Sequence, residues 1–182
     1  GGIMARRPGT WPLVLSVVLV VVPLVSPFSP VTSVGAEENT DQTGNLLFLN
    51  VRGTADRQTG TAPERFAYVL EVYDATNKKI GTVTHDAAFT SATTAEIIST
   101  FKLPNGVLVN RAIEAFAPDS SRQNQFLTGI HPEGPTIQAA KGTGAYAGRT
   151  GRLRMSGWHE TSKFPASLGA NDFYAIELDP KP

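Results

Sequence analysis

Short apolar segments separated by polar turns follow one another along the chain from residue 45 onwards. Most of these segments alternate apolar with polar side chains or carry aliphatic and aromatic residues at nearly every place, and none sustains a helical period of 3.6 residues. The pattern therefore predicts β-strands, which we place at residues 45–52, 65–74, 80–90, 94–103, 107–117, 124–130, 135–140, 151–160 and 172–179.

The spacing of the segments predicts the fold class. Strands recur about every ten residues with turn residues between them, which is typical of an all-β sandwich or barrel. The tripeptide Pro104-Asn105-Gly106 predicts a hairpin turn, because Asn and Gly accept positive φ. We expect a single antiparallel barrel of eight or nine strands, because closure removes the exposed edge strands of an open sheet. A barrel of about eight strands can hold one small ligand.

The N-terminal segment, residues 4–36, reads differently from the rest of the chain. Arg6 and Arg7 precede an apolar run at 11–25, and small residues lead to Ala36. A positive start, a short apolar middle and a small-residue cut site are the parts of a secretory signal peptide. This interpretation predicts cleavage after Ala36, export of the remaining protein and only transient contact with a membrane.

The same apolar segment has a second interpretation, as a retained lid over the mouth of the barrel. Its apolar run is shorter than the roughly 20 residues that a membrane span needs. In this case the protein is cytoplasmic, and the lid candidates are Trp11, Leu13, Leu15, Val18, Leu19 and Val22. Residues 1–3 are interpreted as an expression remnant, 37–44 as a linker and 45–179 as the barrel domain.

Composition narrows the possible functions. The chain has 16 Lys and Arg against 16 Asp and Glu, so no net charge attracts it to nucleic acid. It has no cysteine, which excludes disulfides and thiolate sites. Its histidines, His85, His131 and His159, do not have the spacing of metal ligands. We therefore expect no metal site, and we interpret the histidines as structural or surface residues.

A glycine-rich stretch precedes the predicted strand at 151–160. Gly142, Gly144 and Gly148 give G-x-G-x-x-x-G, but a strand follows where a dinucleotide-binding loop needs a helix. We expect a tight corner instead. In the strand that follows, alternation predicts that Arg152 and Arg154 face outward while Leu153 and Met155 face inward.

Residues that suggest acid–base or nucleophilic catalysis do not form a recognisable set. There is no G-x-S-x-G motif and no Ser/His/Asp combination with a defensible spacing. Four glutamates lie within predicted strands, and any two of them could meet across a barrel: Glu71, Glu96, Glu114 and Glu177. The sequence leaves open which of them do.

The chain resembles the allene oxide cyclase-like barrel superfamily, which is related in architecture to the plant dirigent proteins. The resemblance lies in residues 66–82, 99–109 and 141–157, together with the terminal segment 172–178. Such a resemblance implies a fold more firmly than a function. In the plant cyclases a glutamate and an asparagine on the first strand, an asparagine on the second and a cysteine on the third line the cavity. The matching residues here are Phe48, Asn50, Leu70 and Ala87, so only one asparagine is retained and the plant reaction is disfavoured.

Bacterial members of the same superfamily include the spirotetronate and spirotetramate [4+2] cyclases of polyketide biosynthesis. This resemblance implies a cofactor-independent cyclase that folds a small, apolar, polyketide-like substrate with a tetramate or tetronate head, and that uses no covalent or acid–base residue. A homodimer fits the apolar outer positions. The alternatives are an exported dirigent-like barrel that binds or orients a small apolar ligand, and an allene oxide cyclase-like isomerase.

Counting every second residue from the matched positions predicts the lining of the cavity. The substrate-binding candidates are Phe48, Asn50, Tyr68, Leu70, Val72, Val83, His85, Ala87, Phe89, Leu153 and Met155. We expect at least one of the polar members, Asn50, Tyr68 and His85, to bind the head of the substrate. Alternatively these are ordinary core residues that fill a narrow barrel. A shift of one residue in any strand would exchange its predicted lining for the opposite face.

Overall fold

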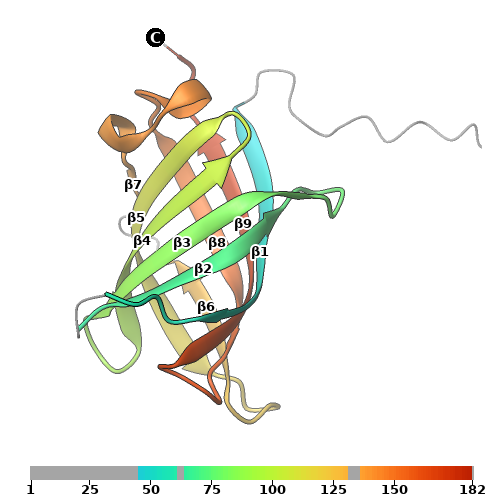
Figure 1. Ribbon diagram of the computed structural model, residues 1–182, viewed down its shortest axis with the longest axis vertical. Helices are drawn as coiled ribbons and strands as arrows, with labels where there is room; N and C mark the ends of the chain where they lie inside the picture. Colours follow the sequence, from blue (N-terminus) through green and yellow to red (C-terminus); the bar gives the residue numbers. More distant parts are fainter. Residues whose placement is uncertain (1–44, 61–63, 131–135, 182) are drawn as a thin grey trace, which may run out of the picture. The chain divides into compact units, whose positions relative to one another are not determined.

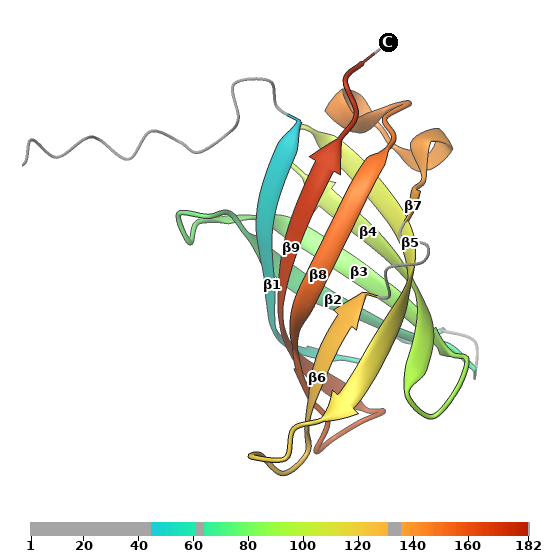
Figure 2. The ribbon, with the colours of Figure 1, turned by 180° about the vertical axis from the view of Figure 1, so that it is seen from behind.

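The computed structural model describes residues 45–60, 64–130 and 136–181, and these form one antiparallel sheet closed into a barrel (Figures 1 and 2). The strands are β1 (Leu46–Asp56), β2 (Phe66–Tyr73), β3 (Lys79–Phe89), β4 (Thr94–Leu103), β5 (Gly106–Pro118), β6 (Gln125–Ile130), β7 (Thr136–Ile137), β8 (Gly151–Glu160) and β9 (Ser167–Leu178).

Eight of these strands close the ring. Neighbours follow the order β1-β2-β3-β4-β5-β6-β8-β9, and β9 pairs back with β1 along the whole length of β1. The ninth strand, β7, is a short addition that pairs with β5 at Asn110 and Arg111, beyond the part of β5 that pairs with β6. The expected all-β antiparallel barrel is therefore confirmed.

Several strand bounds differ from those predicted. Strands β4 and β8 have the predicted bounds, whereas β1 continues to Asp56 and β9 already begins at Ser167. These two extensions pair with each other, with Asp56 opposite Ser167. The predicted strand at 135–140 is reduced to the two residues of β7, followed by a 3₁₀ turn at Ala139–Lys141. Polar residues extend a strand wherever a partner supplies the backbone hydrogen bonds.

An apolar core fills the part of the barrel nearest the β4–β5 turn. Its fully buried members include Val51, Val72, Val83, Phe101 and Ile176, one or two from each of several strands. Each buried side chain of this size contributes about 1.5–3 kcal/mol relative to an exposed one. The core therefore fixes the barrel at this end and leaves any cavity to the other.

The glycine-rich corner caps the same end of the barrel. It forms two 3₁₀ turns, Ala139–Lys141 and Gly144–Tyr146, drawn in orange in Figure 1. The Ala145 amide donates to Asn105 O at 2.7 Å, and a Cβ on Gly144 would lie 2.2 Å from that same oxygen. Tyr146 is buried in the apolar core. The corner is thus a close backbone contact with the β4–β5 turn, as its glycines predict.

The N-terminal predictions fall outside the residues that the structure describes. This applies to the leader at 4–36, to the linker at 37–44 and to the lid candidates Trp11, Leu13, Leu15, Val18, Leu19 and Val22. Signal peptide and lid therefore both remain predictions. Within the described ranges, no helix combines the length and the apolar character needed to cross a membrane.

Candidate functional site

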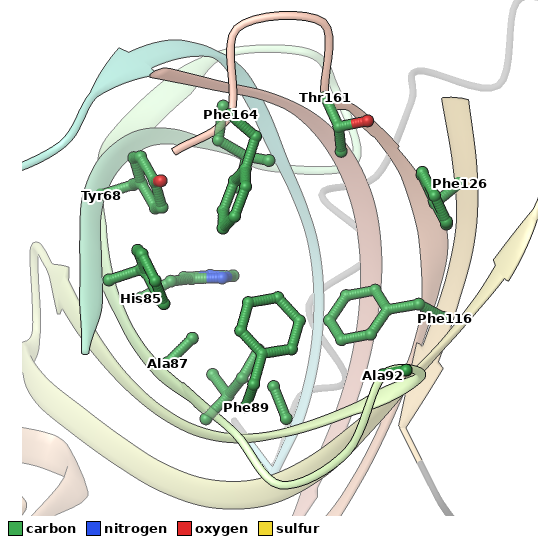
Figure 3. A pocket seen from close by; sticks show the side chains of 13 residues that line it. Tyr68, His85, Ala87, Phe89, Ala92, Phe116, Phe126, Thr161 and Phe164 are labelled. Atoms are coloured by element: carbon green, nitrogen blue, oxygen red, sulfur yellow. The ribbon is translucent and has the colours of Figure 1, made fainter. Parts of the chain in front are cut away.

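An apolar cavity of about 330 Å³ lies at the barrel end opposite the glycine-rich corner (Figure 3). Its volume is at the lower end of the range of about 300–1,000 Å³ that is usual for small-molecule sites. The cavity is lined by Phe66, Tyr68, His85, Ala87, Phe89, Ala92, Ala95, Ile97, Phe116, Phe126, Thr161, Phe164 and Leu168. Most of these residues come from strand ends, and Thr161 and Phe164 come from the β8–β9 loop.

Phenylalanine rings form much of the cavity wall. The rings of Phe66 and Phe164 have centroids 5.1 Å apart, and Phe66 and Phe89 lie 5.7 Å apart with an edge-to-face orientation. Phe116 lies 5.9 Å from Phe89 and continues the wall across β5. Offset and edge-to-face rings at these distances attract one another, so the wall is largely formed before any ligand arrives.

Three polar side chains reach the cavity, and each already has a partner. The Thr161 hydroxyl donates to Asn124 O at 3.0 Å. The Tyr68 hydroxyl donates to Pro165 O at 2.8 Å, which ties the β8–β9 loop to β2. The ring of His85 points towards the centre of the cavity in Figure 3, and its Nε2 lies 3.4 Å from the Tyr174 hydroxyl. Burial lowers the pKa of His85 to about 4, helped by the nearby His159. His85 is therefore a neutral hydrogen-bonding group at neutral pH.

The prediction for β1 is wrong. Phe48 is 46% exposed on the outer surface, and Asn50 Nδ2 donates to Asn171 Oδ1 at 2.8 Å outside the barrel. The inward residues of this strand are Leu49 and Val51. Because β1 carries apolar residues on both faces near its start, alternation alone did not determine which face is internal.

The other predicted lining residues face inward but lie at two depths. Tyr68, His85, Ala87 and Phe89 line the cavity. Deeper in the barrel, outside the cavity, the apolar core contains Leu70, Val72, Val83, Leu153 and Met155. For these residues the alternative of ordinary core packing is the one that the structure supports. Arg152 and Arg154 are exposed on the outer face, as predicted.

Several cavity residues were missed from the sequence. Phe116 and Phe126 lie in predicted strands, and counting by two along those strands would have placed them on an inner face. Phe164 lies in a loop, where no periodicity marks it. Its ring contacts those of Phe66 and Phe89 because closure of the barrel brings the β8–β9 loop beside β2 and β3.

A buried polar cluster, formed by Glu114, His159 and Asp172, lies inside the barrel. His159 Nε2 is 3.1 Å from Asp172 Oδ2 and 3.7 Å from Glu114 Oε1, and the Thr128 hydroxyl donates to the same Glu114 oxygen. Both carboxylates are 0% exposed and the histidine is 4% exposed. The sequence predicted a structural or surface role for His159, and the structure buries it beside two acidic side chains.

Burial and charge shift the proton affinities in this cluster. Burial raises the pKa of Glu114 to about 7, although the charge of His159 acts in the opposite direction. Burial alone would lower the pKa of His159, but Glu114 and Asp172 outweigh it and raise the pKa to about 9. The cluster therefore holds a protonated imidazole between two acids at neutral pH. Within the described part of the chain, no group of His, Cys, Asp or Glu is arranged to hold a metal ion.

Comparison with known proteins gives weak similarities. No family model and no curated protein matches the chain. Two structures each match at 15% identity and a TM-score of 0.37: a heme-binding cyclase that catalyses [4+2] cycloaddition during neoabyssomicin biosynthesis, and the Diels–Alderase AbmU from Streptomyces koyangensis. Each match covers 72% of the present chain and 64% of the chain in the matched structure. The present chain therefore spans less than two thirds of the length of these two proteins.

A third similar structure is AbnU, described as an exo-specific intermolecular Diels–Alderase. It matches at 11% identity and a TM-score of 0.31, and the match covers 72% of the present chain and 99% of the AbnU chain. Scores at this level do not establish a common fold, so the assignment of this barrel rests on its own strand pairing.

Proposed function

We propose that the protein is a cofactor-independent cyclase. It folds a linear polyketide with a tetramate or tetronate head inside the apolar cavity and closes a spiro-linked cyclohexene by an intramolecular [4+2] cycloaddition. The observation behind this proposal is the cavity, whose lining is apolar except for Tyr68, His85 and Thr161. The resemblance of residues 66–82, 99–109 and 141–157 to allene oxide cyclase-like barrels supports it.

The chemistry of a cycloaddition suits such a cavity. The diene and the dienophile exchange three π bonds for two σ bonds and one π bond, and no proton or electron leaves the substrate. The protein therefore needs neither a nucleophile nor a base; it must hold both ends of a flexible chain within bonding distance. Positioning of this kind contributes as much as about 7–11 kcal/mol in favourable cases.

The polar groups at the cavity suit a supporting role. Neutral His85 can donate a hydrogen bond from Nδ1 to a carbonyl conjugated with the dienophile, while its Nε2 accepts from the Tyr174 hydroxyl. The Tyr68 hydroxyl would first have to give up its hydrogen bond to Pro165 O. In a cavity from which water is excluded, such a hydrogen bond is stronger than in solution and stabilises the charge that the carbonyl oxygen gains in the transition state. The aromatic wall provides flat surfaces against which a conjugated diene can stack.

Turnover of a linear substrate tests this proposal. The purified protein without added cofactor is mixed with a polyene acyl-tetramate, the linear precursor of the spirotetramate in pyrroindomycin being the first choice, and the spiro product is followed by liquid chromatography with mass detection. We expect ring closure much faster than in buffer. A matched variant, Leu127→Ala, alters only an exposed side chain of the outer face and should retain this rate. An unaccelerated reaction would refute the proposal.

A second candidate is an exported barrel that binds a small apolar ligand without converting it. It is favoured by the partners that Tyr68 and His85 already have, because their hydrogen bonds also suit a purely structural role. The N-terminus distinguishes the two candidates: cleavage after Ala36 and recovery of the protein from the medium favour the binding protein, whereas a retained N-terminal segment in a cytoplasmic protein favours the cyclase.

The expected homodimer is also retained as a proposal. Phe48 and Phe173 are 46% and 57% exposed on the neighbouring strands β1 and β9, and apolar side chains of this size seldom lie together on a monomer surface without a function. Light scattering should give twice the chain mass, and Phe173→Glu should give the mass of one chain.

A further inference from the structure

The cluster formed by Glu114, His159 and Asp172, here called the inner cluster, is unusual because it places three ionisable side chains together inside a barrel whose interior is mostly apolar. Its members come from β5, β8 and β9. A buried ion pair or triad is often less stable than apolar residues of the same volume. The arrangement therefore requires an explanation other than stability.

Part of the inner cluster lacks hydrogen-bond partners. Among the described residues, Glu114 Oε2 and Asp172 Oδ1 are buried and accept no hydrogen bond, and both polar atoms of Asn110, on the same face of β5 as Glu114, are also unpaired. Each such atom costs about 1–3 kcal/mol when it is left unsatisfied, and native proteins retain few of them. The Thr128 hydroxyl donates to Glu114 Oε1 only, so the second oxygen of this carboxyl group has no hydrogen-bond partner among the described residues.

The inner cluster lies directly behind the wall of the apolar cavity. Phe116 lines the cavity, and its ring centroid is 5.9 Å from that of His159. Ala95, another lining residue, pairs with Glu114 across β4 and β5. On the other side, His85 connects the cavity to Tyr174, which belongs to the same strand as Asp172. Figure 3 shows Phe116 and His85 on the two sides of the cavity.

We propose that Glu114, His159 and Asp172 form an inner site that binds an acidic, enolised dicarbonyl group at the head of the ligand, together with one proton. The chemical class of this head rests on the proposed function. The apolar chain of the ligand occupies the phenylalanine-lined cavity, and Phe116 turns aside so that the head reaches the unpaired carboxyl oxygens.

Charge balance explains why a proton accompanies the head. One imidazolium between two carboxylates leaves the empty cluster with one net negative charge, and an enolate anion would be repelled by it. A proton on Glu114 converts that side chain into a hydrogen-bond donor towards the enolate oxygen. The other titratable groups around Glu114 are His159, Asp172, Tyr174 and His85.

The proton is assigned to Glu114 because its neighbours do not take it up near neutral pH. Burial raises the pKa of Tyr174 well above its ordinary value, so that hydroxyl is already protonated. Burial lowers the pKa of His85 to about 4, so its ring remains neutral. His159 already carries its proton, because its pKa is raised to about 9. Glu114, with a pKa of about 7, is the group that changes state.

Two probes separate the inner site from the apolar cavity. Diphenylhexatriene, an apolar polyene that fluoresces when it is removed from water, reports the cavity. The compound 3-octanoyl-tetramic acid, which carries the acidic dicarbonyl head, is titrated by calorimetry into the full chain in two buffers that differ in their heat of ionisation. We expect the wild-type protein to take up close to one proton per bound tetramic acid above about pH 7, with affinity falling as pH rises.

The variant Glu114→Leu removes the inner site without emptying the space. We expect it to bind the tetramic acid about tenfold or more weakly, the effect of one lost charge-assisted hydrogen bond, while its affinity for diphenylhexatriene changes less than about twofold. The matched control Glu96→Gln changes an outer glutamate that pairs with Arg111 and should bind both probes as the wild type does.

The outcomes distinguish this inference from the proposed function. Equal binding of the tetramic acid by wild type and Glu114→Leu, or binding by the wild type without proton uptake, would overturn the inner site. Should Glu114→Leu fail to fold, Glu114→Gln keeps the shape and should bind the tetramic acid with no proton uptake; uptake in that variant would also overturn it. A wild-type protein that binds the tetramic acid with proton uptake but does not accelerate ring closure refutes the cyclase and leaves the inner site standing.

Discussion

Replacing His85 with leucine should make the barrel more resistant to acid. His85 is 3% exposed, and its ring makes an edge-to-face contact with the Tyr174 ring at 6.2 Å between centroids. Leucine has a similar size and fits an inward position of a strand, but it cannot be protonated. The substitution therefore removes one titrating group from the interior while keeping the space filled.

The expected magnitude follows from the pKa of the histidine. The unfolded chain binds a proton at His85 below pH 6.5, whereas burial keeps the folded protein neutral there until about pH 4. The stability that neutral burial contributes is present above pH 6.5 and is lost as the pH falls towards 4. Between about pH 7 and pH 4.5 this loss amounts to about 2.5 kcal/mol, at about 1.4 kcal/mol for each pH unit.

Urea unfolding at these two pH values measures the effect. The free energy of unfolding of His85→Leu minus that of the wild type should rise by about 2.5 kcal/mol on acidification. Glu114, whose raised pKa acts in the opposite direction over the same range, is present in both proteins and cancels in the difference. Tyr68→Phe, which removes a polar group that does not titrate below pH 7, is the matched control and should show no such rise. A pH-independent difference for His85→Leu would refute the reasoning.

Three further changes have defined outcomes. In Gly157→Ala the new Cβ would lie 2.3 Å from Asp172 Oδ1, so urea unfolding should show a free energy of unfolding lower by about 2 kcal/mol or more. In the control Gly129→Ala the Cβ would have its nearest neighbour at 3.5 Å, and the free energy of unfolding should hardly change. Phe164→Ala should weaken diphenylhexatriene binding about tenfold, and the exposed Leu127→Ala should not, as fluorescence titration can check. Deleting residues 4–36 should lower ligand affinity and turnover if the leader is a lid; full activity of the shortened protein would contradict the lid.

The strands were predictable where alternation and turn chemistry agree. The hairpin between β4 and β5 is an example, because a clear period of two ends at Asn105-Gly106, whose glycine has a φ of 138°. The start of β9 was not predictable in the same way. Residues 167–171 are small or polar apart from Leu168, and they form a strand because the end of β1 lies beside them and completes their hydrogen bonds.

The cavity was predictable in part, and its depth was not. Counting by two identified inward residues on β2, β3 and β8, but it could not show that Val83 is packed in the core while Ala87, four residues further along the same face, lines the cavity. That difference arises from the opposite walls, where Phe101 fills the barrel at one level and the Phe89–Phe116 pair only lines it at another. Interior volume depends on all the strands at once, so no single strand reveals it.

The inner cluster shows how much barrel closure adds to the sequence. The sequence did not distinguish four glutamates, each within a predicted strand: Glu71, Glu96, Glu114 and Glu177. Of these, Glu114 alone faces inward. Among the described residues, the ionisable groups near it come from β8 and β9 and include no other glutamate. One local feature did mark the place. Gly157 is a glycine in the middle of a strand, directly opposite Asp172, and its missing side chain leaves the space that the Asp172 carboxylate occupies. In this barrel the glycine therefore lies opposite the buried Asp172 carboxylate, and His159, two residues further along the same face of β8, is the cation that pairs with it.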